Sequence, residues 1–227
     1  VLVDPFIGGD RTCDKAQRAI RDATHFVLIA TENSINCEHE ERGYQPVTES
    51  WWHARWVTIE RTYAELCAMN DCLVVICIKV GKKTPIPKPL QQFIHIDMED
   101  TSGLGDVCRE LRNCVSSTTP SKDISIDTQL SQEHLNRGRE AERKHALCDT
   151  NYSDDSELHH AIALYDQAIL YNFCNHHAWL NKGWCLWKLE SDMVAWKYVN
   201  TAQLLSPHSD RLGQIVDRML AGQRTLR

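Results

Sequence analysis

Hydrophobic positions along the chain change their spacing near residue 116, and the change predicts two structural classes. Before that point, short apolar runs alternate with segments whose apolar residues recur at helical spacing. A strand that helices cover on both faces is apolar along its length, so each run predicts a buried parallel strand. Strands that alternate with helices predict a doubly wound parallel sheet of the α/β class. We expect strands at residues 26–31, 72–79 and 93–98, and helices at residues 12–23, 51–69 and 103–115.

The second half of the chain follows a polar segment. Residues 116–130 are rich in Ser, Thr and Asp, a composition typical of a linker. Beyond it the apolar spacing is helical throughout, and it ends in a helix at residues 209–222 that we expect to cap the domain. We therefore predict an α/β domain at residues 1–115 and an all-α domain at residues 131–227.

An internal repeat runs through the helical half. Gly138 of a weaker copy answers Gly183 of a stronger one, and Phe173 stands where the stronger copy has Pro207. Small residues at such positions let two antiparallel helices approach closely. The stronger copy resembles a tetratricopeptide repeat (TPR), which implies helical pairs that bind a protein partner or a second protomer. The residues that carry the resemblance are Trp179, Gly183, Leu186, Ala195, Val199, Ala202 and Pro207, with Ala161, Tyr165 and Ala168 one repeat earlier.

A tryptophan-rich segment at residues 49–60 carries the most specific chemical signal. Trp56 and Glu60 lie one turn apart on one face of the helix that this segment opens. The indole ring of Trp56 is therefore expected beside the carboxylate of Glu60. The preceding strand ends at Thr31, and a polar Glu-Asn-Ser segment follows it. The competing interpretation is that the tryptophans are ordinary core residues.

This order of strand, polar loop and tryptophan helix resembles the Toll/interleukin-1 receptor (TIR) domain of the NAD-cleaving type. In that family a strand ends in Ser or Thr with Asn-Ser, and a later Trp-Val-x-x-Glu carries the glutamate. Trp56-Val57-Thr58-Ile59-Glu60 matches that motif at each named position. The resemblance implies a flavodoxin-like fold. Residues 1–10 then correspond to the family's second strand and BB loop, so its first strand and helix would precede Val1.

The same resemblance implies an enzyme that cleaves the bond between nicotinamide and ribose. It would be an NAD+ glycohydrolase or ADP-ribosyl cyclase in innate immune or antiphage signalling, activated by oligomerisation. Glu60 would be the catalytic carboxylate that stabilises an oxocarbenium-like transition state. NAD+ is the substrate, and no cofactor is implied. The other expected residues are Trp56, Phe6, Asp4, Arg11 and Asn33 for substrate binding and Gly8, Gly9 and Asp10 in an assembly loop.

Three alternative interpretations concern the same residues. A TIR domain can be a non-enzymatic adaptor or scaffold that assembles through TIR and TPR contacts, with Glu60 merely solvated. The Gly8-Gly9 turn can cradle a phosphate at a helix N-terminus. Cys174, His176 and His177 are zinc-ligand types, but no second ligand pair has suitable spacing, so we expect no metal site.

Net charge, apolar runs and cysteine spacing limit which partners and which cellular compartment we expect for the protein. The net charge of −6 gives no basic surface for nucleic acid or anionic membranes. No apolar run approaches the roughly 20 residues of a membrane span, and the first residues lack a signal-peptide pattern. Ten cysteines at scattered spacings, with no Cys-x-x-Cys, are interpreted as reduced thiols. We expect a cytoplasmic protein that self-associates through its TIR domain and binds neither nucleic acid nor membrane.

Overall fold

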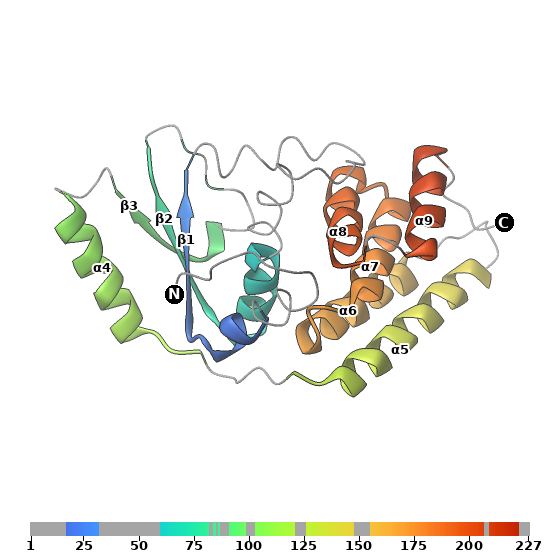
Figure 1. The fold of residues 1–227 in the computed structure, drawn as a ribbon, viewed down its shortest axis with the longest axis horizontal. Coiled ribbons are helices and arrows are strands. Elements are labelled where there is room, and N and C mark those ends of the chain that lie inside the picture. The colour runs from blue at the N-terminus through green and yellow to red at the C-terminus, as the bar shows by residue number, and fades with distance from the viewer. Residues whose placement is uncertain are drawn as a thin grey trace. The chain divides into compact units, whose positions relative to one another are not determined.

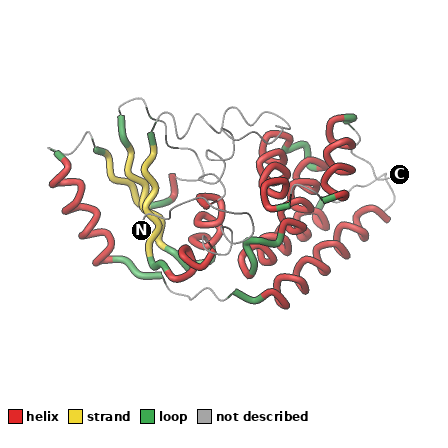
Figure 2. Tube along the Cα trace, viewed as in Figure 1, coloured by secondary structure: helices red, strands yellow, loops and turns green. Residues whose placement is uncertain are grey.

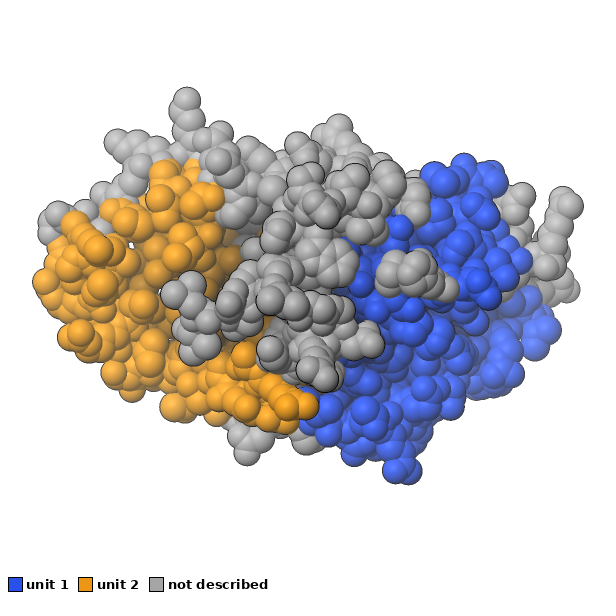
Figure 3. Space-filling view, in the orientation of Figure 1, with its two compact units in different colours: residues 1–14, 41–52, 126–227 blue, residues 15–40, 53–125 orange. Residues whose placement is uncertain are grey.

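The computed structural model separates the chain into two compact units, coloured differently in Figure 3. One contains the described residues up to 120 and holds a sheet; the other contains those from 126 onward and is helical. We call them the α/β unit and the helical unit. The structure describes residues 17–31, 60–81, 84, 86, 91–98, 103–120, 126–147, 155–206 and 209–222.

The α/β unit is built on a sheet of three parallel strands in the order β1-β2-β3. The strands are β1 (His25–Ala30), β2 (Val74–Lys79) and β3 (Ile94–Asp97). All three predicted strands are confirmed, each within two residues at either end. The central β2 is buried along most of its length, as its unbroken apolar sequence predicts.

Helices cover both faces of this sheet (Figure 1). On one face, Ile76, Ile78 and Ile96 form a core with Val107 of α4 (Leu104–Ser117). On the other face, Leu28 and Cys77 pack together. Two further helices, at residues 17–22 and 60–69, lie on this second side. The coarse α/β prediction is therefore confirmed.

On the sheet face against which α4 packs, the side chains of the edge strand β1 are not covered by α4. Val27 pairs with Ile76 in register, and Ile29 pairs with Ile78, so all four side chains lie on the same face. The two β1 side chains are nevertheless exposed, at 40% for Val27 and 59% for Ile29. The α4 core includes residues of β2 and β3 but none of β1.

The helical unit contains five labelled helices, and they pack largely in sequence order. Figure 2 draws these helices in red. Helix α5 packs against α6, α6 against α7, and α7 against α8. Helix α7 also contacts α5 and α9, which makes it the central element. None of the helices in the described parts of the chain is long and apolar enough to cross a membrane. The helices are α5 (Thr128–Leu147), α6 (Ser156–Tyr171), α7 (His176–Lys188), α8 (Asp192–Leu205) and α9 (Asp210–Leu220).

The internal repeat has a direct counterpart in this packing. Gly138 lies against the ring of Tyr165, where an added β-carbon would come within 2.5 Å. Gly183 lies against Val199, where the corresponding distance is 2.7 Å. The two pairs join α5 to α6 and α7 to α8, so each glycine permits one close helix crossing. The small and apolar partners are buried in both copies: Ala161, Tyr165, Ala168, Ala195, Val199 and Ala202.

The predicted linker has an anchor at each end. Thr118 follows α4, and its hydroxyl lies 3.0 Å from Nε2 of His25 at the start of β1. On the other side, the backbone N–H of Asp127 donates to the carbonyl of Tyr171, the last residue of α6. The side chain of Asp127 also accepts from the N–H of Leu130 in the first turn of α5.

Candidate active site

Glu60, the predicted catalytic residue, lies in a helix of the α/β unit. The described part of that helix covers residues 60–69, and Glu60 is its first residue. The other predicted site residues lie outside the described residues. They are the substrate-binding candidates Trp56, Phe6, Asp4, Arg11 and Asn33 and the assembly-loop candidates Gly8, Gly9 and Asp10.

Glu60 belongs to the inward-facing stripe of its helix. Residues three, four and seven positions further on share a helix face with it. These are Tyr63, Ala64 and Cys67, and all three are fully buried. The side chain of Glu60 starts this inward-facing stripe, and Glu60 is half-buried. The geometry is therefore not that of a fully solvated surface acid.

The connectivity directs the first turn of the helix, and with it Glu60, toward the carboxyl edge of the sheet. The helix joins β1 to the parallel β2, so it runs antiparallel to both strands. Its described part rises about 14 Å and β2 spans about 16 Å. The end of the helix leads through Asp71 into β2, so its other end reaches back toward the opposite edge. Ligands of open α/β sheets bind outside that edge.

Burial sets the electrostatics of Glu60. Removal from water raises the pKa of its carboxyl above the ordinary value, because burial disfavours the charged form. No hydrogen bond or ion pair to Glu60 occurs among the described residues. A partly desolvated carboxylate without a local cation interacts strongly with positive charge that develops beside it.

The neighbouring arginine is engaged by a different acid. Nε of Arg61 lies 3.1 Å from Oε1 of Glu65, and both side chains are almost buried. The helix that carries this pair lies on the side of the sheet where Cys77 packs. Burial lowers the pKa of Arg61, and Glu65 opposes that shift. Glu65 thus neutralises Arg61, and Glu60 keeps its own charge available.

An ion pair lies at the carboxyl edge of the sheet, and it was not predicted from the sequence. Lys79 and Asp97 are register partners at the ends of β2 and β3, and Nζ of Lys79 donates to Oδ2 of Asp97 at 2.8 Å. Both side chains are partly exposed. The available signal was that each of these charged residues ends an apolar strand. Parallel pairing then brings the strand ends together.

A histidine on the Glu65 side of the sheet was also missed. His95 is the register partner of Cys77, so its side chain lies on the face that Arg61 covers. Its Nε2 atom is buried and has no hydrogen-bond partner among the described residues. Alternation along Ile94-His95-Ile96 was the signal, because a polar residue between two core residues of a central sheet faces the opposite layer.

The cysteines in the described ranges follow the sequence prediction with one exception. Six described cysteines are free thiols, and burial raises the pKa of Cys67, Cys77 and Cys185. Cys174 is instead disulfide-bonded, and its partner lies outside the described residues, so the prediction of a reduced thiol is wrong there. A disulfide sulfur is not a thiolate ligand. In the part of the chain that the structure describes, no group of three His, Cys, Asp or Glu side chains is placed to hold a metal ion.

Comparison with known proteins adds no assignment. No protein-family model, no curated protein and no solved structure matches the chain. The resemblance to TIR domains and TPR units therefore rests on the residues themselves and stays a prediction.

Proposed function

We propose that the chain is a TIR-type NAD+ glycohydrolase or cyclase in which Glu60 is the catalytic carboxylate. The observation that carries the proposal is the position of Glu60. It is half-buried at the start of a buried helix stripe, at the helix end that points toward the carboxyl edge of a parallel sheet, with a pKa raised by burial. That combination suits a residue that must meet a cationic transition state.

Cleavage of the bond between nicotinamide and ribose is aided by a carboxylate near the ribose. The bond between the ribose C1′ and the nicotinamide nitrogen breaks, and nicotinamide leaves with the electron pair as a neutral molecule. Positive charge then develops on the ribose, and a nearby carboxylate stabilises it. Water adds to C1′ and releases a proton, which gives ADP-ribose. If a nitrogen of the adenine adds instead, the product is cyclic.

The partial burial of Glu60 supports this role over simple solvation. Electrostatic stabilisation grows as the local dielectric falls, so a carboxylate at the rim of the interior acts on the ribose more strongly than one in water. The ion pair of Arg61 with Glu65 supports the same assignment, because the arginine next to Glu60 in the sequence is paired with a different carboxylate. Trp56 and Asn33 are proposed on the family resemblance alone.

For the fold, we propose a flavodoxin-like TIR sheet followed by TPR-like helical pairs. The parallel β1-β2-β3 order supports the first part, and the close crossings at Gly138 and Gly183 support the second. In this proposal the protein is cytoplasmic, and its repeats raise the local concentration of TIR domains during self-assembly.

The direct experiment is incubation of the full chain with NAD+ and measurement of free nicotinamide. A Glu60→Ala variant that folds normally should release none. If the wild-type chain is folded and releases no nicotinamide over a range of protein concentrations, the enzymatic proposal fails. A non-enzymatic TIR scaffold then becomes the better description.

A further inference from the structure

The ion pair at the carboxyl edge of the sheet lies on the same side as the helix of Glu60. Lys79 and Asp97 end β2 and β3, and Nζ of Lys79 lies 2.8 Å from Oδ2 of Asp97. Lys79 follows Cys77 by two residues, so both side chains lie on one side of the sheet. Cys77 packs on the side where the helix of residues 60–69 lies. Ligands of open α/β sheets bind outside this edge.

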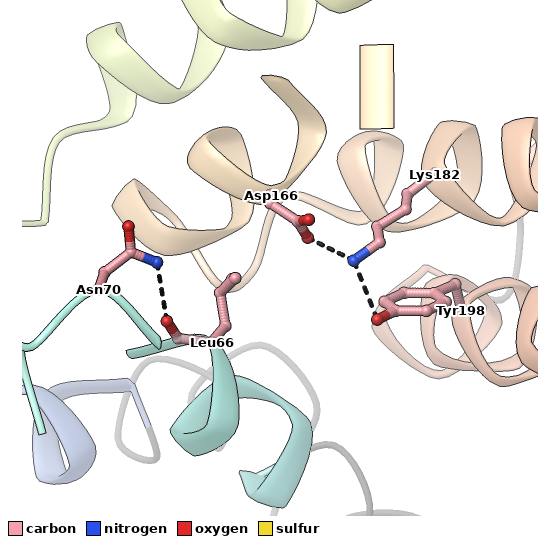
Figure 4. Close-up of polar contacts among 5 residues, drawn as sticks. All are labelled: Leu66, Asn70, Asp166, Lys182 and Tyr198. Atoms are coloured by element: carbon pink, nitrogen blue, oxygen red, sulfur yellow. Dashed lines mark hydrogen bonds and ion pairs between the residues drawn. The ribbon is translucent and has the colours of Figure 1, made fainter. Parts of the chain in front are cut away.

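The helix of residues 60–69 directs Glu60 toward that edge, because its other end leads into the start of β2. The side-chain amide of Asn70 donates to the carbonyl of Leu66 at 2.9 Å, as Figure 4 shows. Asp71 then adopts a left-handed backbone conformation, with φ 59°, and the chain turns into the strand. The last turn of the helix is thus fixed toward the amino edge of the sheet, and the first turn points the other way.

The two sides of β3 differ in polarity. Ile94 and Ile96 face α4 and belong to its core. His95 and Asp97 alternate with them, so they lie on the side of the Glu60 helix. The Nε2 atom of His95 is buried there and has no hydrogen-bond partner among the described residues. The polar side chains of this strand are therefore confined to the side on which the candidate catalytic residue lies.

The Lys79–Asp97 pair offers one cation and one carboxylate to the same ligand. The two side chains are 21% and 27% exposed, so a ligand at the edge can reach both. A simple anion is attracted by the ammonium group but repelled by the carboxylate. A nucleotide suits both, because its phosphates accept from an ammonium group and its ribose hydroxyls donate to a carboxylate. Dinucleotide-binding sheets use an acidic side chain on the ribose in this way.

We infer that the Lys79–Asp97 pair binds the adenosine diphosphate half of a dinucleotide, with Lys79 on the pyrophosphate and Asp97 on the adenosine ribose. The choice of a dinucleotide rests on the proposed function, in which Glu60 acts on the other half. No bond forms or breaks at the pair. Both residues hold the part of the substrate that does not react, so they contribute to its affinity more than to the chemical step.

The test is isothermal titration calorimetry of the full chain with ADP, inorganic pyrophosphate and adenosine as probes. ADP carries both groups that the pair recognises, and each of the other probes carries one. We expect saturable binding of ADP, at least about tenfold tighter than that of either other probe, because two contacts act on one molecule. Absence of saturable ADP binding overturns the inference, and so does pyrophosphate that binds as tightly as ADP.

Variants of matched charge separate a site from diffuse attraction. Lys79→Met should weaken ADP binding about tenfold, the effect of losing a charge-assisted hydrogen bond, and Lys79→Arg should restore most of it. The control is Arg112→Met, which removes a positive charge from an exposed position of α4, on the opposite side of the sheet. It should change ADP affinity by less than about twofold. Equal weakening by Lys79→Met and Arg112→Met would overturn the inference.

Asp97→Asn gives a readout that a structural role does not. This variant keeps the shape of the side chain and removes its charge, so ADP loses a ribose contact while pyrophosphate loses a repulsion. The ratio of ADP affinity to pyrophosphate affinity should therefore fall about tenfold. Loss of a purely structural ion pair would weaken both probes alike, and an unchanged ratio would overturn the inference.

Kinetics separate this inference from the proposed function. In a chain that releases nicotinamide, Lys79→Met should raise the KM for NAD+ about tenfold with a smaller change in kcat. An unchanged KM would overturn the inference and leave the proposed function standing. Saturable ADP binding that Lys79→Met weakens, in a chain that releases no nicotinamide, would support the nucleotide site and refute the proposed function.

Discussion

A β-carbon added to Gly183 would lie 2.7 Å from Cγ2 of Val199 and 3.0 Å from the carbonyl oxygen of Ala195. Real β-carbons do not approach other atoms so closely, and one of the two obstacles is backbone. Helices α7 and α8 therefore touch at this point because residue 183 has no side chain. The same arrangement recurs between α5 and α6, where Gly138 faces Tyr165.

The first prediction follows from that contact. Gly183→Ala should lower the free energy of unfolding by about 1–3 kcal/mol, because overpacking outweighs the gain in helix propensity. Urea titration followed by circular dichroism measures the change. Gly213→Ala is the matched control, since Gly213 lies in α9 and has nothing within 4 Å of an added β-carbon. That variant should be as stable as the wild type or slightly more so, and equal losses in both would contradict the prediction.

A second prediction concerns the buried ion pair of α5 and α7. Glu142→Gln leaves Lys188 buried without its counter-charge, because the side chains of Glu142 and Lys188 are only 9% and 7% exposed. The loss should be about 3–5 kcal/mol. The double variant Glu142→Gln with Lys188→Met should recover part of it, because both charges are then absent. Additive losses in this double-mutant cycle would mean that the two groups do not interact.

The folded state should become less stable in acid, because the unfolded chain binds a proton at His177 more readily than the folded chain does. Its pKa is about 4 in the folded chain and 6.5 in the reference state, so between these values the unfolded chain binds a proton that the folded chain does not. Unfolding is then favoured as pH falls through 6.5 toward about 4. His177→Gln removes this term, so its stability relative to the wild type should increase over that range. Parallel pH profiles for the two proteins would refute the assignment.

Activity per molecule should increase with protein concentration if assembly completes the active site. Self-association raises the effective concentration of the α/β units around one another. Nicotinamide release at several chain concentrations, divided by the amount of chain, measures the effect. A constant value for a chain that stays monomeric would rule out activation by oligomerisation, whatever the role of Glu60.

The elements of the fold were largely predictable, because their signals are local. The unbroken apolar run that ends at Lys79 gives β2 directly, since a strand buried on both faces has no polar side. The helix spacing and the glycines at 138 and 183 give the two helical pairs. The exposure of Val27 and Ile29 could not be predicted from the sequence of β1. The sequence of an apolar strand does not show which of its two faces a helix covers.

The polar contacts were less predictable, because they join residues distant in sequence. Lys79 and Asp97 meet only through strand register, and Glu142 and Lys188, which belong to α5 and α7, lie 46 positions apart in the sequence. For Glu60 the sequence correctly predicted a position in a helix, because that signal is local, and its catalytic role stays a prediction. The sequence interpretation of His176 and His177 considered metal binding and overlooked the burial that lowers the pKa of both imidazoles.

The central claim is that Glu60 provides the negative charge for cleavage of NAD+. The most direct measurement is the initial rate of nicotinamide release by the full chain and by Glu60→Gln, which keeps the shape of the side chain and removes its charge. Glu110→Gln, an exposed residue of α4, is the matched control. The account predicts that Glu60→Gln melts no lower than the wild type and loses about three orders of magnitude in rate, while Glu110→Gln keeps full activity. Near wild-type release of nicotinamide by folded Glu60→Gln would contradict the account.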